Sequence, residues 1–257
     1  MYAQHIAIIS LVGIAYLCPP VQMNNLICRK DVGKDLCAIH INLHATYCEA
    51  HEICEKEGKK RGLRMFIPGN NAPKMVSFFS VTGTVFTSFN AMLNRTTDRR
   101  AGWRVGDPGY AKFVTTKGDT TIPWHTGEPN ADGPTVGLYI GRELFDDLQD
   151  YRNATSVICE TSLRATGGKL ERFQANWPYE LDNLFVRNEY SCGCFKSIKA
   201  NTLIACAKRC KQRTECRSLY FNEKNKECML SLYVDSLLPM RSSVSPGAWV
   251  RFGRPDW

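Results

Sequence analysis

The stretch Trp124-His125-Thr126-Gly127-Glu128-Pro129-Asn130 places a carboxylate and a carboxamide on either side of one proline. A bond that precedes proline is one of the few peptide bonds that adopt the cis form at modest cost. A cis bond here would turn the side chains of Glu128 and Asn130 toward the same side. Two side-chain oxygens presented together suit a hard cation such as calcium. The same residues also fit an ordinary Gly/Pro/Asn turn, so the surrounding chain has to decide between the two.

The cysteines divide the chain into two units. Of the 12 cysteines in 257 residues, five lie between Cys28 and Cys159 and six lie between Cys192 and Cys228. Clusters of this kind indicate separately cross-linked units. The length allows one large domain or two small ones, and the distribution of cysteines favours two.

The first residues indicate the compartment. Residues 6–18 form a mostly apolar run that is short for a membrane span and fits a signal peptide. We expect a signal peptide over residues 1–15, with cleavage as late as about residue 22 as the limit. Residues 1–5 contain no Lys or Arg, which leaves a signal anchor as the alternative. Together with the glycosylation sequons at Asn94 and Asn153, this predicts a secreted, extracellular protein without a transmembrane segment.

Local patterns predict the elements of the first unit. Cys28 and Cys37 flank a glycine and suit a hairpin closed by a disulfide. Apolar residues at helical spacing predict a helix over residues 47–58. Residues 77–89 are rich in Val, Phe, Ser and Thr and predict extended structure, and residues 156–160 predict a short buried strand.

The order of these features carries a resemblance. The hairpin cysteines are followed by an aromatic-x-x-Ala-x-x-x-Cys helix, then by Trp103-x-Val-Gly, the Glu-Pro-Asn loop and Ile158-Cys159-Glu160. In this order residues 28–160 resemble a long-form C-type lectin-like domain. The resemblance implies the disulfides Cys28–Cys37 and Cys54–Cys159.

The resemblance also implies a function for the loop. In that family a Glu-Pro-Asn loop marks calcium-dependent binding of sugars with mannose-like vicinal hydroxyls, and the same oxygens hold both ion and sugar. The family's second cluster, Trp-Asn-Asp, corresponds here to Phe145-Asp146-Asp147. The likeness implies calcium as cofactor and glycans or glycoproteins as partners. The implied metal ligands are Glu128, Asn130, Asp146 and Asp147, and the implied sugar contacts are Glu128, Asn130 and Asp146.

Three positions depart from the family pattern. Val136 stands where the family usually carries a further acid, and Leu138 and Tyr151 stand near the positions of a loop disulfide. One carboxylate fewer implies a weaker calcium site. The departures leave open a second interpretation, in which the loop is structural and the domain is a calcium-independent protein-binding module for adhesion or as a decoy.

The rest of the chain suggests a linker and a second module. Residues 161–182 have the composition of a linker. Residues 178–190 could supply an opening strand, residues 200–213 have helical character, and residues 217–222 and 247–252 predict strands.

Residues 183–257 resemble a PAN/apple domain, a small antiparallel sheet packed on one helix. The resemblance rests on the helix cysteines, the cysteine before a Tyr/Phe strand, and Cys228-x-Leu, and it implies Cys206–Cys228 and Cys210–Cys216. Cys18, Cys48, Cys192 and Cys194 remain; they could form two further bonds that join the domains, or leave an odd thiol for a disulfide-linked dimer. Zinc ligation is a weaker alternative, because an oxidising compartment favours disulfides.

The net charge of +8 is concentrated in the second unit. Residues 196–217 contain seven Lys/Arg and one acid, Glu215. Such a run suits a sulfated glycan or another polyanion, with a solvated helix face as the alternative. Nucleic acid is excluded by the secreted compartment. The polyanion-binding candidates are Lys208, Arg209, Lys211 and Arg213.

No motif indicates an enzyme. His51-Glu52 begins like a zinc-protease helix, but the required second histidine is replaced by Glu55. The sequence therefore predicts an α+β protein of two disulfide-stapled domains that recognises ligands without catalysis.

Overall fold

The computed structural model describes residues 26–31, 34–93, 97–133, 135–162, 172–186, 193–244 and 248–257. Within these residues no helix has the length and apolar character needed to cross a membrane. The expected signal peptide and the sequon at Asn94 lie outside the described residues. In chain order the elements are β1 (Ile27–Asp31), β2 (Lys34–Ile41), α1 (Tyr47–Lys60), β3 (Met65–Phe66), α2 (Ala72–Phe78), β4 (Thr84–Asn90), β5 (Thr135–Ile140), β6 (Glu143–Leu148), β7 (Val157–Thr161), β8 (Gln174–Ala175), β9 (Cys194–Lys199), α3 (Leu203–Lys211), β10 (Cys216–Asn222), β11 (Glu227–Leu232), the 3-10 helix η1 (Met240–Val244) and β12 (Trp249–Gly253).

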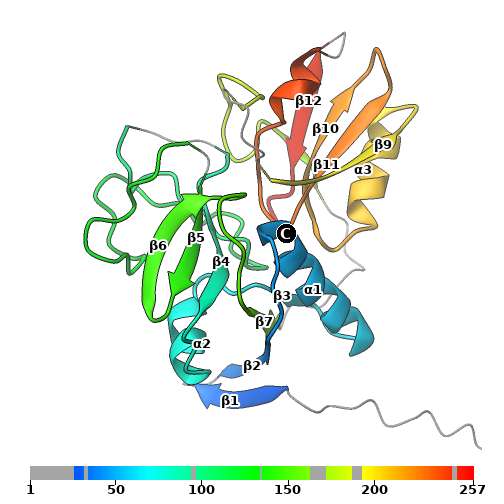
Figure 1. Ribbon diagram of the computed structural model, residues 1–257. Helices are drawn as coiled ribbons and strands as arrows, with labels where there is room; N and C mark the ends of the chain where they lie inside the picture. Colours follow the sequence, from blue (N-terminus) through cyan, green and yellow to red (C-terminus); the bar gives the residue numbers. More distant parts are fainter. Residues whose placement is uncertain are drawn as a thin grey trace, which may run out of the picture.

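These elements form a mixed α+β fold with three sheets and few helices, as predicted, and the described residues contain four disulfides (Figure 1). The first sheet has the order β1-β2-β7-β3, and the edge strand β1 forms the predicted hairpin with β2. Cys28 lies opposite Cys37 in the register of this hairpin. Cys37 is disulfide-bonded, and the side chain of Cys28 is outside the described part of the chain.

Helix α1 starts where a capping box satisfies its first amides. Thr46 Oγ1 accepts from Glu49 N at 3.4 Å, and Glu49 Oε2 accepts from Thr46 N at 2.9 Å. The apolar face of α1 packs into the core, and the disulfide Cys54–Cys159 attaches the helix to the central strand β7. This is the pairing that the resemblance implies.

The second sheet, with the order β4-β5-β6, corrects one prediction. Residues 77–89 are not extended throughout, because α2 occupies the first part and β4 begins only at Thr84. A proline in the first turn favours the start of α2, and Ala72, Met75 and Val76 are buried on its inner face. Residues 97–133 then form a long loop without a helix or strand. Trp103, which is fully buried, anchors this loop against Trp124 at a ring-centroid distance of 4.5 Å.

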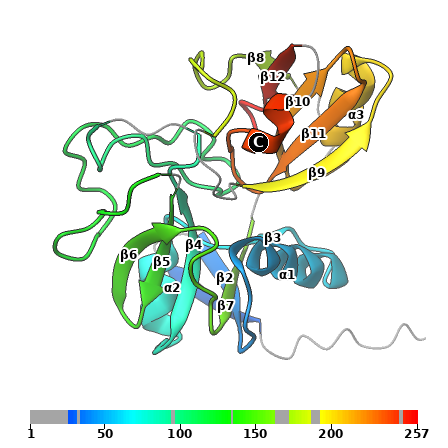
Figure 2. The same cartoon turned by 45° about the horizontal axis from the view of Figure 1, so that its top comes forward.

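The C-terminal unit consists of a five-stranded sheet, β8-β12-β10-β11-β9, with α3 on one face (Figure 2). Cys206–Cys228 and Cys210–Cys216 fix α3 to β11 and β10. Two boundaries differ from the predictions. The segment 161–182 is not a linker throughout, because Gln174–Ala175 form β8 at the edge of this sheet. Among the described residues of 178–190 no strand forms, and only a single bridge joins Phe185 to Leu238.

The two units share a buried junction. The disulfide Cys48–Cys194 links α1 to β9, and Cys194 and Val234 belong to the same apolar cluster as Tyr47 and Ala50. The ring of Tyr233 stacks on His51 with centroids 4.7 Å apart, and its hydroxyl donates to Glu55 Oε2 at 2.6 Å. These contacts join the units into one body rather than two domains on a flexible connection.

Candidate functional site

The Glu128-Pro129-Asn130 segment lies at the edge of the second sheet, where the long loop returns to β6. Trp124 forms a bridge with Leu144, and His125 N donates to Leu144 O at 2.8 Å. A turn follows, in which Glu128 N donates to His125 O at 3.0 Å. Gly127 has φ +90°, a conformation that favours glycine. The Glu128–Pro129 bond is cis, as the sequence suggested it could be.

Three of the four predicted ligands come together in this segment. Asn130 Nδ2 donates to Glu128 Oε1 at 2.7 Å, so the two side chains lie on the same side of the loop. The backbone amides of Asn130 and Ala131 donate to Asp146 Oδ1 at 2.7 and 3.2 Å. Asp146 therefore anchors the loop to β6 and places its carboxylate beside Glu128.

The electrostatics of this cluster are unfavourable for two bare carboxylates. Burial and the neighbouring Asp146 carboxylate raise the pKa of Glu128. Glu128 Oε2 is buried, and no donor reaches it from the described residues. A buried carboxylate oxygen without a donor costs free energy that a bound cation would recover. The side chains present are oxygen donors, the kind that calcium prefers.

Asp147 does not join this cluster. Its Oδ2 accepts from Arg152 Nε at 2.6 Å, and its Oδ1 accepts from the amide of Leu148 at 2.8 Å. Successive side chains of a strand point to opposite faces, so β6 cannot direct both Asp146 and Asp147 to the loop. In the described residues no group of three or more His, Cys, Asp and Glu could hold a metal, and the cluster is limited to Glu128, Asn130 and Asp146.

Of the three positions that depart from the family pattern, two lie in the core and one is exposed. Val136 and Leu138 are fully buried and belong to the apolar cluster beneath the second sheet. Tyr151 is 70% exposed, with Arg152 over its ring at 5.5 Å. An acid at position 136 would have to be buried among apolar side chains, so this position cannot supply a ligand to the loop.

Arg100 was not identified from the sequence as part of the site. Its Nη2 donates to Glu128 O and its Nη1 donates to Asp119 O, each at 3.3 Å. Arg100 thus joins the carbonyl beside the candidate ligand to another part of the long loop. No motif could have indicated this, because the contact depends on the folded path of the loop.

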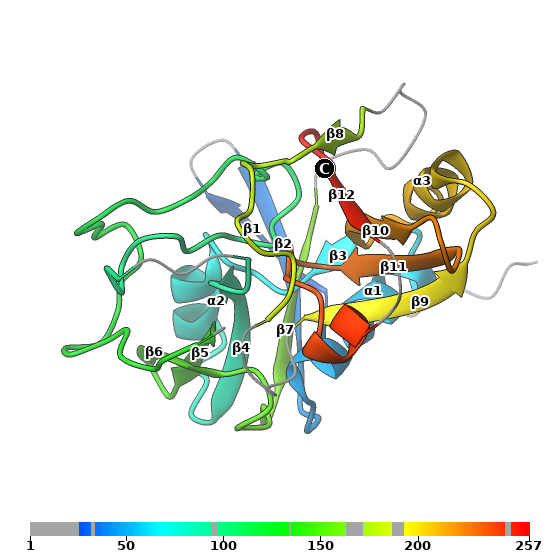
Figure 3. The ribbon, with the colours of Figure 1, turned by 90° about the horizontal axis from the view of Figure 1, so that it is seen from above.

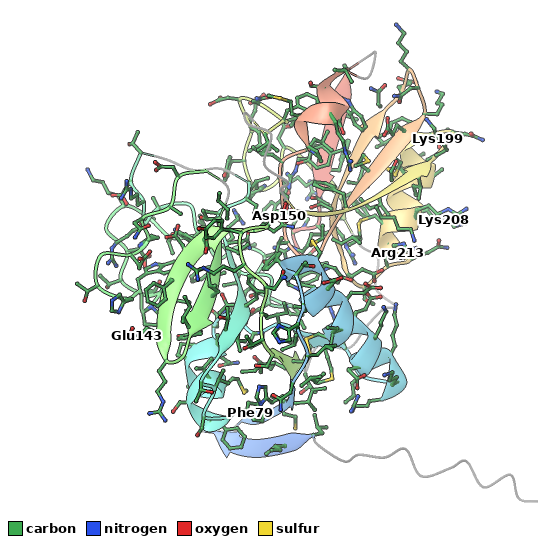
Figure 4. The ribbon with its side chains drawn as sticks, in the orientation of Figure 1. Phe79, Glu143, Asp150, Lys199, Lys208 and Arg213 are labelled. Carbon is green, nitrogen blue, oxygen red and sulfur yellow. A yellow bond between two sulfur atoms is a disulfide. The ribbon has the colours of Figure 1, made fainter. Side chains whose placement is uncertain are left out.

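The other predicted sites lie away from the loop. Asn153 is exposed in the segment between β6 and β7, as a glycan acceptor must be. Lys208, Arg209 and Lys211 are exposed on α3, and Figure 4 labels Lys208 on this helix. Arg213 differs from them, because its Nη1 pairs with Glu215 Oε1 at 2.9 Å.

Comparison with known families identifies the second unit. Residues 186–246 match the model of the PAN domain family. The C-terminal unit is thus similar to the PAN domain family, and we refer to it below as the PAN domain. Its sheet packed on a single helix, held by Cys206–Cys228 and Cys210–Cys216, is the arrangement that the resemblance implies. No curated protein matches the chain.

Solved structures similar to the chain are C-type lectins, and they cover its N-terminal part. CEL-I from Cucumaria echinata has 15% identity and a TM-score of 0.38, over 58% of this chain and 99% of that chain. The EPNH mutant of CEL-I has 16% identity and a TM-score of 0.37, over the same shares of the two chains. TC14 from the tunicate Polyandrocarpa misakiensis has 15% identity and a TM-score of 0.37, over 51% of this chain and 100% of that chain.

Proposed function

We propose that this protein is a secreted, non-catalytic recognition protein that binds mannose-type glycans in a calcium-dependent manner. Glu128, Asn130 and Asp146 are the residues that would hold the ion and contact the sugar. The observation that carries the proposal is the pair of carboxylates beside the Glu-Pro-Asn loop, with Glu128 Oε2 buried and lacking a donor among the described residues. The PAN domain and the disulfides support an extracellular recognition role.

The chemistry of the three side chains fits a weak calcium site. Calcium takes six to eight oxygen ligands, and the loop supplies only a few of them. The remaining positions are available to water and to two neighbouring hydroxyls of a sugar, which is why the ligand would be a vicinal diol. Asp147 has no part in the proposal, because it pairs with Arg152.

A thermal melt with and without calcium tests the ion. At about 100 times the dissociation constant, a ligand that binds only the folded state stabilises it by about 2.7 kcal/mol. That corresponds to a rise in melting temperature of about 5–10 °C for a chain of this size. We expect this rise in the native protein and its loss in Glu128→Gln. Glu143→Gln is the matched control, because Glu143 is an exposed carboxylate on β6 that contacts His125 of the loop at 3.4 Å but lies outside the cluster of candidate ligands.

Retention on mannose and fucose resins tests the sugar. The native protein and Glu143→Gln should be retained with calcium and released by chelator, whereas Glu128→Gln should flow through. The double variant Glu128→Gln, Asn130→Asp should shift preference toward galactose, as the related galactose-type motif implies. A protein that shows no calcium-dependent retention on either resin would contradict the proposal and favour calcium-independent protein binding. A glycan array run with and without chelator would then identify the natural sugar.

A further inference from the structure

Helix α3 of the PAN domain turns a charged face to solvent. Cys206 and Cys210 are fully buried and tie the inner face of the helix to the sheet. The opposite face carries Ile204, Lys208 and Lys211, which follow one another at intervals of four and three residues. Residues at this spacing lie on one side of a helix. The exposed side of α3 is therefore a row that includes two lysines, with Arg209 beside it.

These charges are not neutralised within the helix. The sequence of α3 contains no acid, and among the described residues neither Lys208 nor Arg209 forms an ion pair. Arg213, the fourth predicted cation, is held by the buried Glu215 and does not add an independent charge. Lys208 and Arg209, both on the last turn of α3, are thus the charges of the helix that a ligand could reach.

Neighbouring elements extend the basic surface. Lys196 and Lys199 of β9 are exposed, but they leave the strand on opposite sides, and Lys196 lies on the side of Ile198, which packs in the cluster beneath α3. Lys224 and Lys226 are exposed in the turn between β10 and β11, together with one acid, Glu223. Lys199 Nζ donates to Asn225 O at 3.1 Å, which joins the end of β9 to this turn. We call α3, Lys196 of β9 and the two lysines of this turn the basic face. Lys199 and Lys208 lie along one outer side of the PAN domain in Figure 4.

The basic face is remote from the candidate calcium site. The long loop of residues 97–133 lies on the opposite side of the molecule from α3 when the protein is seen from above (Figure 3), and the views of Figures 1 and 2 agree. A ligand on the basic face would not compete with a ligand at the loop.

We propose that the basic face binds a sulfated polysaccharide, a function beyond the one proposed for the loop. Flexible lysines spread over a helix, a strand and a turn suit an extended polyanion better than a compact anion, which would need a pocket. A membrane surface is less suited, since Ile204 is the only large apolar side chain among the residues of the basic face named here, and interfacial helices carry a broad apolar stripe. Disulfide-rich proteins occupy the extracellular space, where sulfated polysaccharides are the abundant polyanions.

Heparin–agarose chromatography of the full chain in chelator tests the proposal. We expect retention that weakens as NaCl rises, because salt screens exposed charges. Lys208→Glu with Arg209→Glu should lower the affinity for heparin by about tenfold. Lys112→Glu with Lys117→Glu is the matched control: it makes the same change in net charge at exposed positions of the long loop and should lower the affinity much less.

Other outcomes would contradict the binding of a sulfated polysaccharide by the basic face. Equal losses in both double variants would show that net charge alone causes retention. Tighter binding to vesicles of anionic lipid or to an acidic protein than to heparin would assign the surface to another partner. Glu128→Gln should bind heparin like the native protein, so failure of the proposed calcium site leaves this result unchanged. Protein captured on heparin should still bind mannan when calcium is added, if both proposals hold.

Discussion

The candidate site and the junction between the two units differ in their energetics, because the site holds unfavourable charges and the junction contains stabilising contacts. At the loop, Glu128 and Asp146 are held together although their charges repel, and one buried carboxylate oxygen has no donor from the described residues. At the junction, Tyr233 stacks on His51, its hydroxyl is hydrogen-bonded to Glu55, and a disulfide joins the two units. The candidate site thus carries an electrostatic cost that a bound cation would relieve, and the junction supplies stability that makes such a cost tolerable.

The junction also explains how a loop without regular structure can be held in place. The long loop contacts the PAN domain directly, since Gly109 N donates to Trp257 O at 2.8 Å. The ring of Trp257 in turn lies between Arg64 of the first unit and Arg217 of β10, with guanidinium carbons 4.2 and 4.3 Å from its centre. The PAN domain therefore supports one end of the loop whose other part carries the candidate site.

Removal of the disulfide between the units should have the largest effect. Cys48→Ala with Cys194→Ala opens a cross-link with a sequence separation of 146 residues. We expect a loss of about 3 kcal/mol in the free energy of unfolding and a fall of about 10 °C in melting temperature. Urea unfolding followed by circular dichroism measures the free energy, and a thermal melt measures the melting temperature. Cys210→Ala with Cys216→Ala, which opens a separation of only 6 residues, should cost less by the chain-entropy argument.

Two results of that experiment would contradict the contrast between the candidate site and the stabilising junction. The native protein should unfold in one transition, and two resolved transitions would show that the units are independent. The calcium response at the loop should survive in the variant, because Glu128, Asn130 and Asp146 all belong to the first unit. Loss of that response would mean that the junction shapes the site directly.

Acid should weaken the junction through His51. Burial lowers the pKa of His51 to about 3, below its ordinary value of 6.5. Between these values the unfolded chain binds a proton that the folded chain does not, so stability is lost as pH falls below about 6.5. At pH 4.5 the loss from this group should reach about 2–3 kcal/mol relative to pH 7. Urea unfolding at the two pH values measures it.

Phenylalanine at position 51 isolates this effect. His51→Phe keeps an aromatic ring beside Tyr233 but cannot be protonated, so its stability should fall less between pH 7 and pH 4.5 than that of the native protein. The control is His44→Phe, because His44 is exposed in the segment before α1. If His51→Phe and the native protein lose equal stability in acid, His51 is not the group responsible.

The sequence could predict the elements that local patterns determine. Both units could be predicted from the spacing in α1, the order of motifs up to Cys159 and the helix cysteines of α3. Three candidate site residues could also be named from the loop and the following strand: Glu128, Asn130 and Asp146. The structure places the Asp147 side chain beside Arg152 and apart from the other three predicted ligands. Its position depends on which face of β6 each residue occupies, and that register is fixed by pairing with β5. Adjacent acids in a sequence do not reveal that one of them will pair with Arg152.

Contacts between residues far apart in the sequence could not be predicted from local sequence patterns. Cys48 and Cys194 were left without assigned partners, since joining the domains was only one of several alternatives that four spare cysteines allowed. β8 could not be recognised in residues 161–182, because two exposed residues become a strand only when β12 is beside them. The same holds for Arg100, whose contact with the Glu128 carbonyl spans 28 residues. These features follow from the assembled tertiary structure rather than from residue type or spacing.

The smallest expected effect is the change in stability that follows substitution of Glu128, and it tests whether the ionised carboxylate is unfavourable in the loop. Because burial and Asp146 raise the pKa of Glu128, the ionised carboxylate is unfavourable in the folded protein at neutral pH when no cation is present. In chelator at pH 7, Glu128→Gln should therefore be slightly more stable than the native protein, by about 0.5 kcal/mol or about 1–2 °C. The advantage should vanish as pH falls below about 4.5, where the unfolded and the folded carboxyl are both protonated. Calorimetry in chelator across this range measures it, with Glu143→Gln as the control. A variant that is less stable than the native protein at pH 7 would show that Glu128 is a structural residue of the turn, and the contrast between an unfavourable site and a stabilising junction would then be lost.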